Sequence, residues 1–167
     1  MKLSGRRAKP KRLAPIAVIV EEPEWRKAAP GIAGRLRRAA TLTLARAGKG
    51  EKNMQLTILL TNDARQKKLN ALFRGKNAPT NVLSFPSSTD SKYLGDVAIA
   101  YGVSSGEAKT SSKRLADHAA HLAVHGVLHL LGYDHERACD AAIMEPLETR
   151  ILASLGVADP YAARKAA

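Results

Sequence analysis

The chain has 167 residues, 45% of them hydrophobic, and its 27 Lys and Arg outnumber its 15 Asp and Glu, which gives a formal net charge of +12. This length and apolar content predict one domain that can bury its own core. Cys139 is the single cysteine, which excludes an internal disulfide and a CxxC pair and favours a reducing cytosol. No apolar stretch is long enough to span a bilayer, so we expect a cytoplasmic protein with no membrane partner.

Positive charge is concentrated at the start of the chain. Residues 1–13 contain six Lys and Arg and no acidic residue, and residues 1–14 have the composition of a flexible basic arm. Basic surface binds polyanions by releasing counterions from phosphates, so the charge is consistent with a nucleic-acid partner. Charge alone does not separate this interpretation from one in which it only keeps the protein in solution.

The first elements after the arm alternate between strand and helix. Residues 16–20 are mostly β-branched and are flanked by prolines, which predicts a strand. Residues 32–47 place apolar side chains at helical spacing opposite arginines and predict a helix, and residues 55–60 predict a second strand. A short helix capped by Asn62 or Asp63 is expected next.

This short helix is expected to turn Leu69, Leu72 and Phe73 towards the core, because the three side chains recur at helical spacing. Two further strands are predicted over residues 80–85 and 94–100, separated by a polar connection. The predicted sheet therefore has about four strands.

Two long helices complete the predicted fold. Residues 107–131 have a helical pattern, and their second half is apolar nearly all round, which predicts a buried central helix that ends at Gly132. The last helix, over residues 140–155, carries an apolar stripe at i, i+4 steps, formed by Ile143, Leu147, Ile151 and Leu155. We expect an α+β fold, with a small mixed sheet packed by helices in a single domain at 15–160, and a short tail at 161–167.

Three histidines at the end of the central helix have the spacing H-x3-H-x5-H. Residues i and i+4 share one helix face, so the imidazoles of His125 and His129 can converge. Gly132 can adopt a left-handed conformation that lets the chain turn back and bring His135 to the same point. Three imidazoles suit Zn²⁺ and leave a fourth coordination position open, as in catalytic zinc sites. We expect one zinc ion on these three side chains.

The same spacing occurs in the extended zincin motif HExxHxxGxxH, but Gly126 stands where that motif has its Glu. Because this Glu is the general base of metallopeptidases, peptidase activity is disfavoured.

Nearby, His121 could support His125, line the cleft or simply pack. Asp134 could accept an imidazole N–H or cap a helix, and Cys139 is expected to be a buried thiol rather than a fourth ligand.

Arg74 lies in a cationic turn and could bind phosphate or be a solvated turn residue. Over roughly residues 16–160 the chain resembles the YbeY family of bacterial endoribonucleases. The resemblance rests on the segments NALFRGKNAPTNVLSFP, LGDVAIA, AHLAVHGVLHLLGYDH and MEPLETRILASLG.

The resemblance implies a single-strand-specific, metal-dependent endoribonuclease that acts in ribosomal RNA maturation, at the 3′ end of the small-subunit RNA, and in ribosome quality control. It makes His125, His129 and His135 the zinc ligands and Arg74 an arginine needed for activity. The implied partners are single-stranded and ribosomal RNA, the small ribosomal subunit and its assembly factors. Asp96 also falls on a family motif, without an assigned role.

Several alternatives stay open at this point. The nucleophile could be zinc-bound water or the 2′-OH of the RNA, and the base could be His121, Asp134 or solvent. A ribosome-assembly or RNA-binding factor with a structural zinc would unfold when the metal is removed. A zinc hydrolase of another substrate is the third function, and the net charge of +12 favours a nucleic acid over it.

Overall fold

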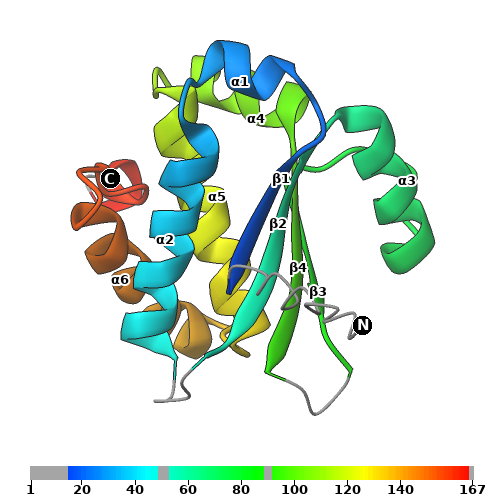
Figure 1. Cartoon of the computed structure of the whole chain (residues 1–167). Helices are drawn as coiled ribbons and strands as arrows, with labels where there is room; N and C mark the ends of the chain where they lie inside the picture. The colour runs from blue at the N-terminus through cyan, green and yellow to red at the C-terminus, as the bar shows by residue number, and fades with distance from the viewer. Residues whose placement is uncertain (1–14, 49–52, 89–91, 166–167) are drawn as a thin grey trace, which may run out of the picture.

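Strands and helices alternate along the chain. The computed structural model describes residues 15–48, 53–88 and 92–165, so the predicted basic arm lies outside the described residues. The elements are β1 (Ile16–Val20), α1 (Glu24–Ala28), α2 (Ile32–Ala47), β2 (Gln55–Thr61), α3 (Asp63–Arg74), β3 (Val82–Pro86), β4 (Tyr93–Ala100), α4 (Tyr101–Thr110), α5 (Leu115–Leu130), α6 (Ala138–Ala153) and α7 (Ala162–Lys165) (Figure 1).

The four strands form one mixed sheet in the order β1-β2-β4-β3. β1 is parallel to β2 and β2 is parallel to β4, whereas β3 runs antiparallel to β4. The central strands β2 and β4 contain the most buried residues, whereas the edge strands β1 and β3 are mostly half-buried. The predicted fold, a small mixed sheet of about four strands packed by helices, is confirmed.

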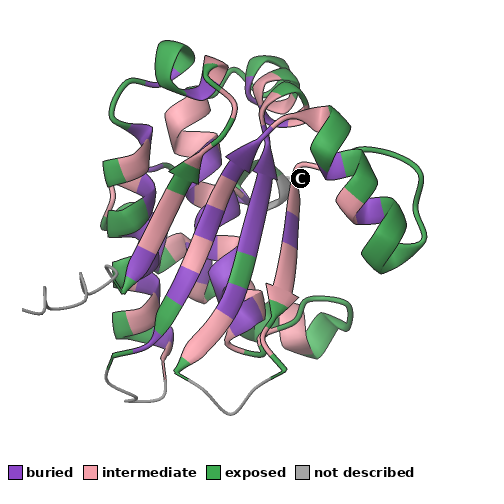
Figure 2. Cartoon of the chain, turned by 45° about the vertical axis from the view of Figure 1, so that its right-hand side comes forward, coloured by how far each residue is buried: buried purple, intermediate pink, exposed green. Residues whose placement is uncertain are grey.

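The two faces of the sheet are covered unequally. Helices α2 and α5 pack on one face, and α6 packs against both of them in a further layer (Figure 1). Helix α3 stands against the opposite face, where it contacts β4, and half-buried and exposed residues run along the strands beside it (Figure 2). The predicted burial of the central helix is confirmed, because α5 contributes nine buried residues to the core. No described helix has the length and apolar character needed to cross a membrane.

The helix predicted over residues 107–131 is two helices, so this prediction is wrong in its boundaries. Helix α4 begins at Tyr101 and ends at Thr110, and α5 begins only at Leu115. Between them Ser112 has a left-handed φ of 52°. The break falls on a run of Thr and Ser, whose side chains compete with the backbone for hydrogen bonds and weaken a helix.

The orientation predicted for α3 is also wrong, although its predicted cap is confirmed. Asn62 accepts a hydrogen bond from the first turn of the helix at 2.9 Å. Leu72 and Phe73, however, are 76% and 62% exposed. The buried face instead presents two amides, because Gln66 donates to a carbonyl of β4 and Asn70 donates to a carbonyl in the loop after α3. Amide contacts of this kind leave no signal in an apolar pattern.

A β-bulge in β4 requires a glycine. Tyr93 pairs with Gln55 and Gly95 pairs with Leu56, so one extra residue lies between them. Gly95 has a φ of 135°, and a Cβ atom there would lie 2.1 Å from the carbonyl oxygen of Phe85 on β3. Only glycine tolerates both conditions.

Gly95→Ala is therefore expected to lower the free energy of unfolding by about 2–4 kcal/mol, because backbone strain and the clash with β3 add together. Urea unfolding followed by circular dichroism would measure this change. Gly34→Ala is the matched control, because a Cβ atom at that position in α2 meets nothing within 4 Å. Equal stability of the two variants would contradict the role given to the bulge.

Candidate metal centre

Three imidazoles converge at the C-terminal end of α5. The nitrogen atoms that His125, His129 and His135 offer lie within 4.8 Å of one another. The Nε2 atoms of His125 and His129 are 3.1 Å apart. Two nitrogen ligands on a tetrahedral zinc ion with bonds of about 2.0–2.1 Å would be separated by about 3.3 Å. The donor set and its spacing therefore fit a zinc-sized ion.

The chain reversal that brings in the third histidine follows from Gly132. This residue has a φ of 88°, in the left-handed region where glycine is favoured. The N–H of Tyr133 then donates to the carbonyl of Leu128 at 3.0 Å and closes the helix end. Beyond this turn, Asp134 accepts a hydrogen bond from the backbone N–H of His135 at 2.7 Å, and this bond lowers the pKa of the Asp134 carboxyl. Asp134 therefore acts as a cap of the turn.

The environment favours the neutral imidazole of His129. Partial burial lowers its pKa most, and the neighbouring His125 and His135 lower it further. The neutral form has the free lone pair that a metal ion requires. His125 and His129 are half-buried, whereas His135 is exposed, so the cluster is open to solvent on the side of the last histidine.

A buried carboxylate stands behind the first histidine. Glu148 of α6 is fully buried, and its Oε1 lies 2.8 Å from Nδ1 of His125. The hydroxyl of Tyr161 donates to the other carboxylate oxygen. Burial alone would raise the pKa of Glu148, but contacts with His121 and hydrogen bonds from His125 and Tyr161 outweigh it and lower the pKa to about 2. Glu148 is therefore an anion at neutral pH.

Sequence reasoning missed Glu148 because the apolar stripe of the last helix was placed one residue away. The predicted stripe included Ile143, which is 62% exposed. The buried face of α6 is formed by Met144, Glu148, Ile151 and Leu152. A charged residue on a buried helix face needs a polar partner elsewhere in the fold. The charge of Glu148 at such a position is therefore the sequence signal that could have revealed this contact. Tyr161 lies in the predicted tail, yet it is only 9% exposed.

His121 packs behind the cluster. Its ring makes edge contacts with the rings of His125 and Tyr161, with centroids 6.2 and 6.0 Å apart. Its Nε2 lies 3.6 Å from Oε1 of Glu148, which is beyond hydrogen-bonding distance. Of the alternatives for His121, a packed side chain is the one that these contacts favour.

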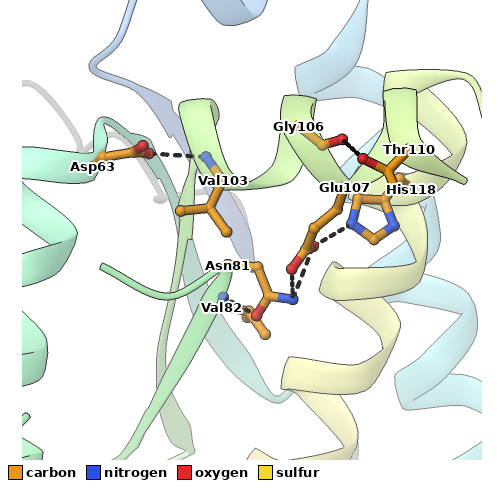
Figure 3. Close-up of polar contacts among 8 residues, drawn as sticks. All are labelled: Asp63, Asn81, Val82, Val103, Gly106, Glu107, Thr110 and His118. Atoms are coloured by element: carbon orange, nitrogen blue, oxygen red, sulfur yellow. Dashed lines mark hydrogen bonds and ion pairs between the residues drawn. The ribbon is translucent and has the colours of Figure 1, made fainter. Parts of the chain in front are cut away.

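A second histidine–carboxylate pair lies at the N-terminal end of α5 (Figure 3). Nε2 of His118 is 2.7 Å from a carboxylate oxygen of Glu107, and Asn81 donates to both oxygens of the same carboxylate (Figure 3). Burial lowers the pKa of His118, and the contact with Glu107 partly offsets this effect. These contacts join α4 and α5 to the start of β3. His118 is not one of the converging imidazoles.

Arg74 and Cys139 lie outside the histidine cluster. Arg74 is exposed at the last residue of α3, on the opposite face of the sheet from α5 (Figure 1). Among the described residues, no hydrogen bond or ion pair joins Arg74 to the histidines. Cys139 is exposed in the first turn of α6, so the predicted burial of its thiol is wrong. The buried face of α6 starts only at Met144, one turn later.

Fold and site together define a protein with a small mixed sheet packed by helices and a candidate metal centre at the end of its central helix. The sequence profile of a family described as endoribonuclease YbeY matches residues 27–156. An endoribonuclease YbeY of Paramagnetospirillum magneticum is 45% identical over 155 residues, which cover 87% of this chain and 94% of that protein. One of Ruegeria pomeroyi is 44% identical over 160 residues, which cover 85% and 94%.

A solved structure supports the same fold. The solution structure of a protein from Thermotoga maritima superposes with a TM-score of 0.57 at 21% identity, over 90% of this chain and 92% of that one. The profile match and the identities to curated relatives are decisive for the family. The chain belongs to the YbeY family, as the sequence motifs predict.

Proposed function

We propose that this protein is a zinc-dependent endoribonuclease that cuts single-stranded RNA in the cytoplasm. The observation that carries the proposal is the convergence of His125, His129 and His135 at one open point. The relatives named endoribonuclease and the net charge of +12 support an RNA substrate. The physiological substrate is ribosomal RNA, at the 3′ end of the small-subunit RNA, and the partners are the small subunit and its assembly factors. The same activity serves ribosome quality control.

One zinc ion is held by His125, His129 and His135, and when bound it supplies a Lewis acid for a phosphate oxygen of the RNA. The protein's own part is to present three imidazole nitrogens with fixed orientation. Partial burial lowers the pKa of His129 and so favours its neutral form, and Glu148 accepts the Nδ1 proton of His125, so Nε2 of His125 stays free. Exposure of His135 leaves room for a single strand to approach.

Arg74 contributes positive charge to the reaction by pairing with a phosphate of the bound strand. Arg74→Glu is expected to lower the rate of RNA cleavage by about a hundredfold, because the bound strand loses a phosphate contact that positions it for cleavage. Cleavage of single-stranded ribosomal RNA by the purified protein measures this loss, with bound zinc determined in the same samples. Zinc content should not change, since Arg74 offers no ligand atom.

Lys67→Glu is the matched control, because it reverses an exposed charge on the same helix. Equal losses in both variants would mean that overall charge matters rather than Arg74. If the folded wild-type protein binds ribosomal RNA without cutting it, the assembly-factor alternative becomes the better one. A 2′,3′-cyclic phosphate on the product would assign the nucleophile to the 2′-OH.

A further inference from the structure

The segment that follows α6 reaches back to the metal centre through one carboxylate. We infer that Glu148 and Tyr161 are positioning residues, which hold His125 with its Nε2 facing His129 so that a metal ion can bind. This inference rests on the proposed function, since it assumes that His125 is a ligand. It assigns the C-terminal segment to the metal centre rather than to a tail.

The two oxygens of Glu148 have different partners. Oε1 lies 2.8 Å from Nδ1 of His125, and the hydroxyl of Tyr161 donates to Oε2. A carboxylate in this position makes Nδ1 the protonated nitrogen, which leaves the lone pair on Nε2. Nε2 of His125 is 3.1 Å from Nε2 of His129, so the lone pair points to where the ligand atoms converge.

The burial of Glu148 indicates that its charge has a role other than packing. Its side chain is fully buried, as are its apolar neighbours Met144, Ile151 and Leu152 on the same face of α6. An apolar residue would fill such a position at lower cost in desolvation.

Hydrogen bonds to Asp159 fix the position of Tyr161. Asp159 accepts hydrogen bonds from Thr149 of α6 at 3.1 Å and from the backbone N–H of Tyr161 at 2.9 Å. These bonds hold the segment after α6 against the helix that carries Glu148. The ring of Tyr161 is buried and makes an edge contact with His121. Its hydroxyl therefore approaches Glu148 from a fixed support.

The test compares metal affinity in the full-length protein, with Zn²⁺ and Co²⁺ as the probes in competition with a chromophoric chelator. Glu148→Gln is expected to weaken binding by about 10–100-fold, as for loss of other carboxylates behind a ligating histidine. Tyr161→Phe keeps the ring and should weaken binding by about 3–10-fold, with a shifted Co²⁺ absorption spectrum in both variants. The double variant should bind like Glu148→Gln, because Tyr161 acts through that carboxylate.

Glu107→Gln is the matched control, because Glu107 of α4 contacts His118 of α5 at 2.7 Å and does not touch the converging imidazoles. Its affinity for both metals should equal that of the wild type. Unfolding curves of the metal-free variants show whether a variant has lost metal affinity or has lost its fold. If Glu148→Gln does not fold, the affinity of Tyr161→Phe decides the test.

Three results would overturn the inference, at different levels. Wild-type affinity and an unchanged Co²⁺ spectrum in Glu148→Gln, or in Tyr161→Phe if Glu148→Gln does not fold, would refute the positioning role while leaving the proposed function intact. Additive losses in the double variant would show that Tyr161 acts independently of Glu148. A folded wild-type protein that binds neither metal would overturn the proposed function and this inference together.

Discussion

Replacing His129 by alanine is expected to remove bound metal and to lower the rate of RNA cleavage by at least about a hundredfold, more than the loss of a residue that only supports a ligand. Nε2 of His129 lies 3.1 Å from Nε2 of His125, as two ligands of one metal ion would. Without His129, only two of the three imidazole ligands are left. Metal content after dialysis and cleavage of single-stranded ribosomal RNA give the two measurements.

His118→Ala is the control for this experiment, because His118 lies on the same helix but contacts Glu107 instead of the cluster. It should retain the metal. Chelation of the wild-type protein should abolish cleavage, and added zinc should restore it. Cleavage by His129→Ala at the wild-type rate would point to a contaminating nuclease. If chelation unfolds the protein, the zinc is structural and the assembly-factor alternative gains support.

Features set by near neighbours in the chain were predictable. The spacing of His125 and His129 fixes their common helix face, and Gly132 supplies the left-handed turn that leads to His135. The strands were also predictable, because their β-branched runs are short and bounded by Pro, Gly or polar residues. In each case the determining residues lie within about one helical turn or one strand of each other.

Features set by contacts between distant segments were missed. Glu148 meets its partners only when α6 packs on α5 and the chain returns to Tyr161. The face of α3 is likewise chosen by Gln66 and Asn70, whose amides find carbonyls elsewhere in the fold. Apolar periodicity registers neither kind of contact, since it records burial of hydrocarbon and not pairing of polar groups.

The glycine between the first two histidines is explained by packing. Gly126 faces the sheet, where a Cβ atom would lie 2.6 Å from Cγ1 of Val97 and 3.2 Å from the hydroxyl of Ser84. The same hydroxyl donates to the carbonyl of Gly126 at 3.1 Å. Helix α5 therefore approaches β3 and β4 so closely that any side chain at this position must displace its neighbours.

Gly126→Glu, which would restore the zincin motif, is expected to lower the free energy of unfolding by more than about 4 kcal/mol, because it drives an unpaired carboxylate into a filled core. Peptidase activity should not appear, since position 126 faces Val97 of β4 and not the converging imidazoles. Denaturant unfolding and a peptide-cleavage assay measure the two outcomes.

Gly126→Ala tests the packing without the charge, and it should cost about 1–3 kcal/mol, as overpacking does in other cores. Val97→Ala removes the methyl groups that the new Cβ would meet, so Gly126→Ala should cost less in that background than in the wild type. A stable Gly126→Glu protein would contradict this account, because the side chain would then have found space beside the metal centre. The peptidase's base is missing here because close helix–sheet packing excludes it.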